Sequence, residues 1–137
     1  MPFVLDASIA ACWAFEDEDH PRAALALERI RTDEARVPGL WWFEVRNVLL
    51  VNERRGRISK TDTTGFLRNL SRLGVTLDRS PDEAALLSLA RQYRLTVYDA
   101  SYLELARRDR LPLATLDTDL AHAARAEGLA LIDEASC

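Results

Sequence analysis

The chain has 137 residues, of which 48% are hydrophobic and 29% are charged, a balance typical of a soluble globular protein. No apolar run approaches the ~20 residues of a membrane helix, and the amino terminus does not resemble a signal peptide. The two cysteines, Cys12 and Cys137, are too few for a disulfide framework. We therefore expect one domain spanning residues 1–137, located in the cytoplasm.

The net charge of −4 at pH 7 argues against a broad basic surface for nucleic acid. Lys60 is the only lysine among the 18 basic residues. This composition excludes most mechanisms that need a catalytic lysine, unless Lys60 itself serves.

The first predicted element is a strand at residues 3–5, where three apolar residues lead directly into Asp6. A helix follows, with Asp6 or Ser8 as its cap. Asp6 is then expected at the carboxyl end of a central parallel strand, where open α/β sheets bind ligands. The alternative is that Asp6 only caps the helix.

Helices and strands alternate along the rest of the chain. Further helices are predicted at residues 21–30, 40–55, 59–72, 81–93, 98–109 and 117–127. Further strands are predicted at residues 35–37, 75–77, 113–116 and 129–132. This alternation predicts a parallel sheet with helices on both faces.

The helix predicted at residues 40–55 is apolar almost all round, which indicates burial on more than one side. Part of the buried surface could be covered by a partner instead of by the protein's own core. Trp41 and Trp42 are expected mainly in the core. Glu44 interrupts this pattern, and a carboxylate near a buried face is costly unless it is paired or binds a metal. The alternatives are that Glu44 is exposed or pairs with an arginine such as Arg46.

Local structure explains four carboxylates poorly: Asp6, Glu44, Asp99 and Asp117. Each aspartate taken alone could be a helix cap. Clustered together, the four would repel one another, and a hard divalent cation would remove that conflict. Oxygen ligands favour Mg²⁺ or Mn²⁺ over zinc. His20 and His122 lack the spacing of metal ligands and are expected on the surface.

The order of these motifs resembles that of PIN-domain ribonucleases, in particular the VapC toxins of bacterial toxin–antitoxin pairs. Four segments carry the resemblance over nearly the whole chain: residues 4–8 (VLDAS), 38–49 (PGLWWFEVRNVL), 98–106 (YDASYLELA) and 115–120 (TLDTDL). The resemblance implies a three-layer α/β/α fold with a central parallel sheet. It also implies an endoribonuclease that depends on Mg²⁺ or Mn²⁺.

The resemblance also implies the residues of the site. The expected catalytic residues are Asp6, Glu44, Asp99 and Asp117. The expected metal ligands are Asp6, Asp99, Asp117 and Asp119, and the expected supporting residues are Ser8, Asn47 and Thr115. Asp119 could instead cap the last helix, and both aspartates can serve only if that helix begins at or after Asp117.

The expected partners are RNA, a cognate antitoxin and a second copy of the chain. A candidate phosphate-binding patch consists of Arg54, Arg55, Arg57 and Lys60. A solvated helix end explains that patch equally well. The apolar excess around Trp41, Trp42, Leu50 and Val51 suits a partner helix, with ordinary core packing as the alternative.

Two other functions remain open at this point. A receiver-like or dehalogenase-like phosphotransfer domain also places an aspartate after its first strand, but it needs a lysine near the phosphoryl group. A non-catalytic binding module would use these acidic residues as caps only.

Overall fold

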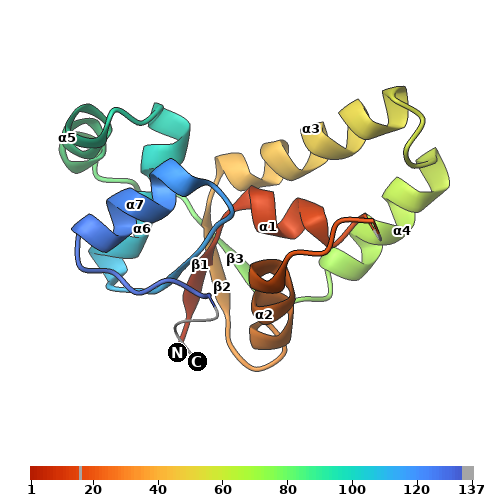
Figure 1. The fold of residues 1–137 in the computed structure, drawn as a ribbon, viewed down its shortest axis with the longest axis horizontal. Helices are drawn as coiled ribbons and strands as arrows, with labels where there is room; N and C mark the ends of the chain where they lie inside the picture. The colour runs from red at the N-terminus through yellow and green to blue at the C-terminus, as the bar shows by residue number, and fades with distance from the viewer. Residues whose placement is uncertain (16, 134–137) are drawn as a thin grey trace.

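A four-stranded parallel sheet forms the centre of the protein (Figure 1). The computed structural model describes residues 1–15 and 17–133, so Cys137 lies outside the described residues. The strands are β1 (Phe3–Leu5), β2 (Ala35–Pro38), β3 (Val75–Asp78) and β4 (Leu113–Ala114), in the order β3-β2-β1-β4. Because all the pairings are parallel, the carboxyl ends of the strands lie at one edge of the sheet.

Helices cover both faces of this sheet. In the described part of the chain they are α1 (Ala7–Cys12), α2 (Pro21–Arg29), α3 (Leu40–Arg54), α4 (Lys60–Leu70), α5 (Glu83–Tyr93), α6 (Val97–Asp109) and α7 (Thr118–Ala126). Figure 1 shows α5, α6 and α7 on one side of the sheet and α1 to α4 on the other. The predicted three-layer α/β/α fold is therefore confirmed. None of the described helices has the length and apolarity required to cross a membrane.

Strand β1 is the most enclosed element. Its residues Phe3, Val4 and Leu5 are fully buried, because β2 and β4 pair with its two edges and helices cover its two faces. Burial of each such side chain contributes roughly 2 kcal/mol to stability. This burial places the next residue, Asp6, at the centre of the sheet's carboxyl edge.

Some predicted boundaries are wrong. Residues 129–132 form no strand, and only a single bridge joins Leu131 to Leu113. Strand β4 ends at Ala114, which pairs with the last residue of β1, and the hydroxyl of the next residue, Thr115, bonds with Asp6 and with the Asp117 amide. Helix α5 begins at Glu83, because the carboxylate of Asp82 caps it, so Pro81 precedes the helix.

The prediction that the helix at residues 40–55 is buried on more than one side is wrong for the described chain. The buried positions of α3 form one stripe: Trp41, Val45, Leu49 and Asn52. Trp41 is in the core as expected, but Trp42 is 43% exposed, Phe43 is 69% exposed and Leu50 is 46% exposed. An apolar composition does not distinguish a core face from a surface that awaits a partner.

Candidate active site

Asp6 lies directly after β1 and is buried. It occupies the position before α1, but its side chain makes no capping hydrogen bond. Instead, its Oδ2 accepts hydrogen bonds from the hydroxyls of Ser8, at 2.9 Å, and Thr115, at 2.6 Å. Burial raises the pKa of Asp6, and the Thr115 and Ser8 hydrogen bonds oppose that shift. The capping interpretation therefore does not account for this side chain.

The same two hydroxyls tie the loop after β4 to the loop after β1. The amide of Leu116 donates to Ser8 Oγ at 3.1 Å, and the amide of Asp117 donates to Thr115 Oγ1 at 3.0 Å. Each hydroxyl thus donates to Asp6 and accepts from the chain that leads to Asp117. This reciprocal bonding holds Asp6 and Asp117 at adjacent strand ends.

Asp117 caps α7, because its Oδ1 accepts from the amide of Asp119 at 3.0 Å. Helix α7 begins at Thr118, after Asp117, so the condition under which Asp117 and Asp119 could both serve in the site is fulfilled. The side chain of Asp119 is exposed and is not among the groups that shift the pKa of Asp99. Asp117 therefore caps α7 with Oδ1, as the capping interpretation predicts, and also belongs to the group of carboxylates that raise the pKa of Asp99.

Asp99 lies in the first turn of α6 without being its cap. Thr96 is the cap, and its hydroxyl accepts from the Asp99 amide at 3.1 Å. Desolvation raises the pKa of Asp99 to about 6, with further contributions from the charges of Asp117, Asp6 and Glu44. The other three carboxylates are therefore near enough to act on Asp99.

Glu44 projects from α3 and is half-buried. Its Oε1 accepts a hydrogen bond from the hydroxyl of Tyr102 on α6 at 2.6 Å. Arg46 does not pair with it, because that guanidinium bonds the carbonyl of Trp42 and stacks on the Trp42 ring. Burial, followed by the nearby charge of Asp6, raises the pKa of Glu44.

The acidic cluster, defined as Asp6, Glu44, Asp99 and Asp117, has no basic partner among the described residues. Within residues 1–15 and 17–133, the side chains as they stand bring no three possible ligands together around one point. The chemistry of the donors nevertheless fits a hard divalent cation, because all four are carboxylates and burial disfavours the ionised forms of Asp6, Glu44 and Asp99.

Asn47 and the four basic residues make no hydrogen bond or ion pair with this cluster in the described part of the chain. Asn47 is exposed one turn along α3 from Glu44. Arg54 lies ten residues along the same helix, about 15 Å away at the helical rise. The guanidinium of Arg57 is engaged with Asp17 and Glu18, so its charge is compensated. Arg55 and Lys60 are exposed, as are His20 and His122, whose expected surface position is confirmed.

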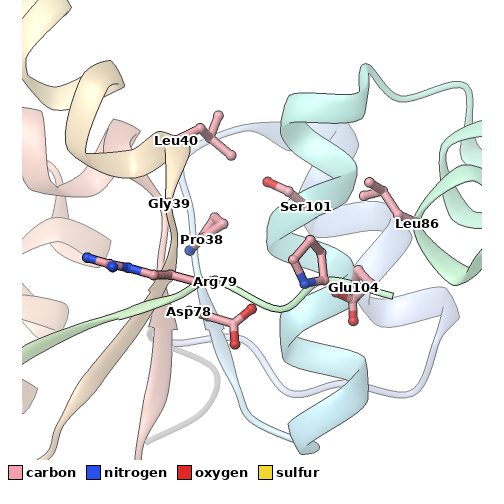
Figure 2. A pocket seen from close by; sticks show the side chains of 9 residues that line it. Pro38, Gly39, Leu40, Asp78, Arg79, Leu86, Ser101 and Glu104 are labelled. Atoms are coloured by element: carbon pink, nitrogen blue, oxygen red, sulfur yellow. The ribbon is translucent and has the colours of Figure 1, made fainter. Parts of the chain in front are cut away.

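A separate cavity of about 280 Å³ lies on a different face of α6 (Figure 2). Leu40, Arg79 and Leu86 contribute to its walls, and none of the acidic cluster does. Glu104 also lines it, but this carboxylate is bound by the guanidinium of Arg108 and by the amide of Asp82. The cavity is therefore distinct from the candidate active site.

Tyr102 is the one residue of the site that the sequence did not reveal. Its ring is fully buried, so it reads as an ordinary core position of a helix. Its hydrogen-bond partner Glu44 lies 58 residues away, and no local spacing indicates that contact. The available signal is its position three residues after Asp99, on the same helical face.

Comparison with known proteins agrees with this architecture. The PIN domain family model matches residues 3–126. Ribonuclease VapC3 of Pyrobaculum aerophilum is 31% identical over 88% of this chain and 93% of its own length. The chain therefore belongs to the PIN domain family, in its VapC branch, as the order of the acidic motifs predicts.

Solved structures with low sequence identity share the fold. PAE2754 from Pyrobaculum aerophilum has a TM-score of 0.71 at 23% identity, covering 90% of this chain and 84% of its own. FitAcB from Neisseria gonorrhoeae has a TM-score of 0.66 at 14% identity, covering 96% of both chains. VapC20 of Mycobacterium tuberculosis, described as a sarcin-ricin loop cleaving toxin, has a TM-score of 0.60 at 12% identity. The match covers 88% of this chain and 94% of its own.

Proposed function

We propose that this protein is an endoribonuclease that depends on a divalent cation and acts as the toxin of a toxin–antitoxin pair. The observation that carries the proposal is the acidic cluster, four coupled carboxylates without a basic partner among the described residues, at the carboxyl edge of a PIN fold. The name of the relative Ribonuclease VapC3 supports RNA as the substrate. The description of VapC20 as a toxin supports the biological role.

In this proposal Asp6, Asp99 and Asp117 hold Mg²⁺ or Mn²⁺, and Asp119 is a further candidate ligand. When bound, the cation supplies the positive charge that activates water and offsets charge on the phosphodiester. Ser8 and Thr115 orient Asp6 through their hydroxyls. Glu44 would complete the set of groups around the cation and orient the attacking water, so the reaction would need no side-chain nucleophile. Asn47, on the next turn of α3, is a candidate support for Glu44.

Exposed basic residues of the α3–α4 turn would contact the RNA backbone. Arg54, Arg55 and Lys60 are suited to this, because they carry uncompensated charge on the surface. Arg57 is less suited, because Asp17 and Glu18 already neutralise it. Since Arg54 lies about 15 Å along α3 from Glu44, a contact there would hold RNA beside the site rather than within it.

The proposed protein partners are a cognate antitoxin and a second copy of the chain. The exposed apolar residues of α3, Trp42, Phe43 and Leu50, support a partner-covered surface. The curated relative is a VapC protein, which supports the pairing with an antitoxin.

Phosphotransfer is less well supported than nuclease activity. Lys60 lies at the start of α4, where it lines a surface hollow with Thr61, Thr64 and Arg68. None of the acidic cluster lines that hollow. A lysine so placed is not positioned to neutralise a phosphoryl group on Asp6.

The test is cleavage of a panel of tRNA and rRNA by the purified protein, freed of any antitoxin, with Mn²⁺ or Mg²⁺. We expect discrete cuts that disappear with EDTA and in Asp99→Asn. The control is Asp82→Asn, which changes the aspartate that caps α5, a role that Asn can also fill. Cuts that persist in Asp99→Asn would refute the site, and a folded wild-type protein that makes no cuts would refute the function.

A further inference from the structure

Two side chains of helix α6, Arg108 and Tyr102, each bind a glutamate, one through a charged group and the other through a neutral group. Glu104 is 2% exposed and is held by the guanidinium of Arg108, which neutralises its charge. Glu44 is held by the neutral hydroxyl of Tyr102. Among the residues that the structure describes, no other group donates a hydrogen bond to Glu44 and no cation pairs with it. The two contacts serve different purposes, because only the first removes charge.

The hydroxyl of Tyr102 can fix a carboxylate without cancelling its charge. A phenol has an ordinary pKa of about 10, so it is a neutral donor at physiological pH. An arginine in the same place would orient Glu44 equally well, but its positive charge would compete with a cation in the acidic cluster. The choice of partner preserves negative charge at the site.

The position of Tyr102 links the helices that carry Glu44 and Asp99. Residues three apart on a helix share a face, so Tyr102 lies one turn below Asp99 on α6. Its hydrogen bond then reaches across to α3. Because its ring is fully buried, Tyr102 cannot contact RNA and can act only through the groups it holds.

We propose that Tyr102 is the positioning residue of Glu44: its hydrogen bond to Oε1 holds the carboxylate in one orientation and leaves Oε2 without a hydrogen-bond partner among the described residues, available to the cation site. This inference rests on the proposed function and specifies how Glu44 takes part in it. Removing the hydroxyl leaves Glu44 charged but free to rotate. The loss is then one of orientation, which lowers both cation affinity and cleavage.

The test is Tyr102→Phe, made alone and in a Glu44→Ala background. Mn²⁺ affinity is measured by calorimetry, RNA cleavage by gel, and the fold by circular dichroism. We expect Tyr102→Phe alone to weaken Mn²⁺ binding and cleavage by about 10–100-fold, as for other groups that orient a ligand. In the Glu44→Ala background the same change has no further effect, because the hydroxyl has no acceptor left to position.

Tyr93→Phe is the matched control. The Tyr93 hydroxyl also bonds a glutamate, Glu127, which pairs with Arg107 and is not a member of the acidic cluster. This variant retains wild-type Mn²⁺ affinity and cleavage. If Tyr102→Phe does not fold, Glu44→Asp replaces it: the shorter side chain keeps the charge, withdraws it from the hydroxyl, and weakens Mn²⁺ binding similarly.

The outcomes separate the inference from the proposed function. Full Mn²⁺ affinity in Tyr102→Phe, or in Glu44→Asp where that variant is used, overturns the positioning role. If Tyr102→Phe weakens Mn²⁺ binding equally with and without the Glu44 side chain, the positioning role is also overturned. The hydroxyl would then affect the site by stabilising the fold and not by orienting Glu44. Weaker Mn²⁺ binding that requires Glu44, in a protein whose wild type cuts no RNA, supports the positioning role and refutes the nuclease. A wild type that binds no Mn²⁺ overturns both.

Discussion

Thr115 connects two carboxylates of the acidic cluster through one hydroxyl. It donates to Asp6 at 2.6 Å and accepts from the amide of Asp117 at 3.0 Å. The residue is buried, so water cannot replace either bond. The precision of the site therefore depends on a side chain that carries no charge.

Replacing Thr115 with Val tests this dependence, because the two side chains have the same shape and differ by the hydroxyl. We expect activity to fall by about 10–100-fold, since Asp6 loses its shortest hydrogen bond. Stability should fall by about 1–3 kcal/mol, because two polar groups lose their partner. Cleavage assays and urea unfolding measure the two effects. Thr115→Ser retains the hydroxyl and should retain most activity; equal losses in both variants would contradict the role of the hydrogen bonds.

Single site residues could be predicted from the sequence where they differ from the pattern of their own segment. Asp6 follows an apolar strand and Glu44 interrupts an apolar helix, so each stands out in its own segment. Tyr102 does not, because its function depends on a contact with α3 that only the folded chain creates. The engagement of Arg57 with Asp17 was also hidden, because the two belong to segments 40 residues apart.

Helix α6 is the element on which most of the site depends. One face presents Asp99 and Tyr102 to the acidic cluster. Another places Glu104 and Arg108 against the carboxyl end of β3, where Arg108 also binds both oxygens of Asp78. This second contact restrains the position of α6 along the strands of the sheet, because it joins the helix to the end of β3.

Arg108→Ala should destabilise the protein by about 3 kcal/mol, since it leaves the buried carboxylate of Glu104 without its cation. Urea unfolding at neutral pH measures the change. Arg31→Ala is the comparison, because Arg31 pairs with Glu28 in an exposed surface pair, and its loss should cost less than about 1 kcal/mol. Equal costs for the two variants would mean that burial of Glu104 does not matter.

Elements were predicted well where an amphipathic or capping pattern is local. The helix predicted at residues 59–72 is such a case, because α4 begins directly after Ser59, whose side chain bonds reciprocally with Asp62. Ends and edges were predicted less well. The last predicted strand is only a bridge to β4, because residues 129–132 alone cannot show whether a neighbouring strand will pair with them. The sequence left the exposed face of α3 open between a core and a partner surface, because apolar residues look alike in both settings.

The stability of the whole molecule should depend jointly on pH and on a divalent cation. The pKa of Asp99 is about 6 in the folded protein and 3.8 in its ordinary state, so the folded form binds more protons between these values. Without a cation, the contribution of Asp99 to stability therefore falls as pH rises from about 4 to about 6. A cation reverses this trend, because it favours the ionised cluster.

Melting temperatures with Mg²⁺ and with EDTA should therefore nearly coincide at pH 5 and diverge at pH 7.5, with Mg²⁺ stabilising. Asp99→Asn should melt higher than the wild type in EDTA at pH 7.5, since it removes a repelled charge, and should respond little to Mg²⁺. Differential scanning fluorimetry suffices for both measurements. A Mg²⁺ shift of equal size at both pH values would contradict a cluster that must ionise to bind.

The acidic cluster draws on segments spread across the described chain, and this has a consequence for synthesis. Asp6, Glu44 and Asp99 emerge from the ribosome before β4 and α7 do. Until those last elements join β1, Asp6 lacks the Thr115 hydrogen bond and Asp117 is absent from the site. A nascent chain thus lacks the complete acidic cluster until β4 and α7 have been made, so under the proposed function it could not cut RNA before that point.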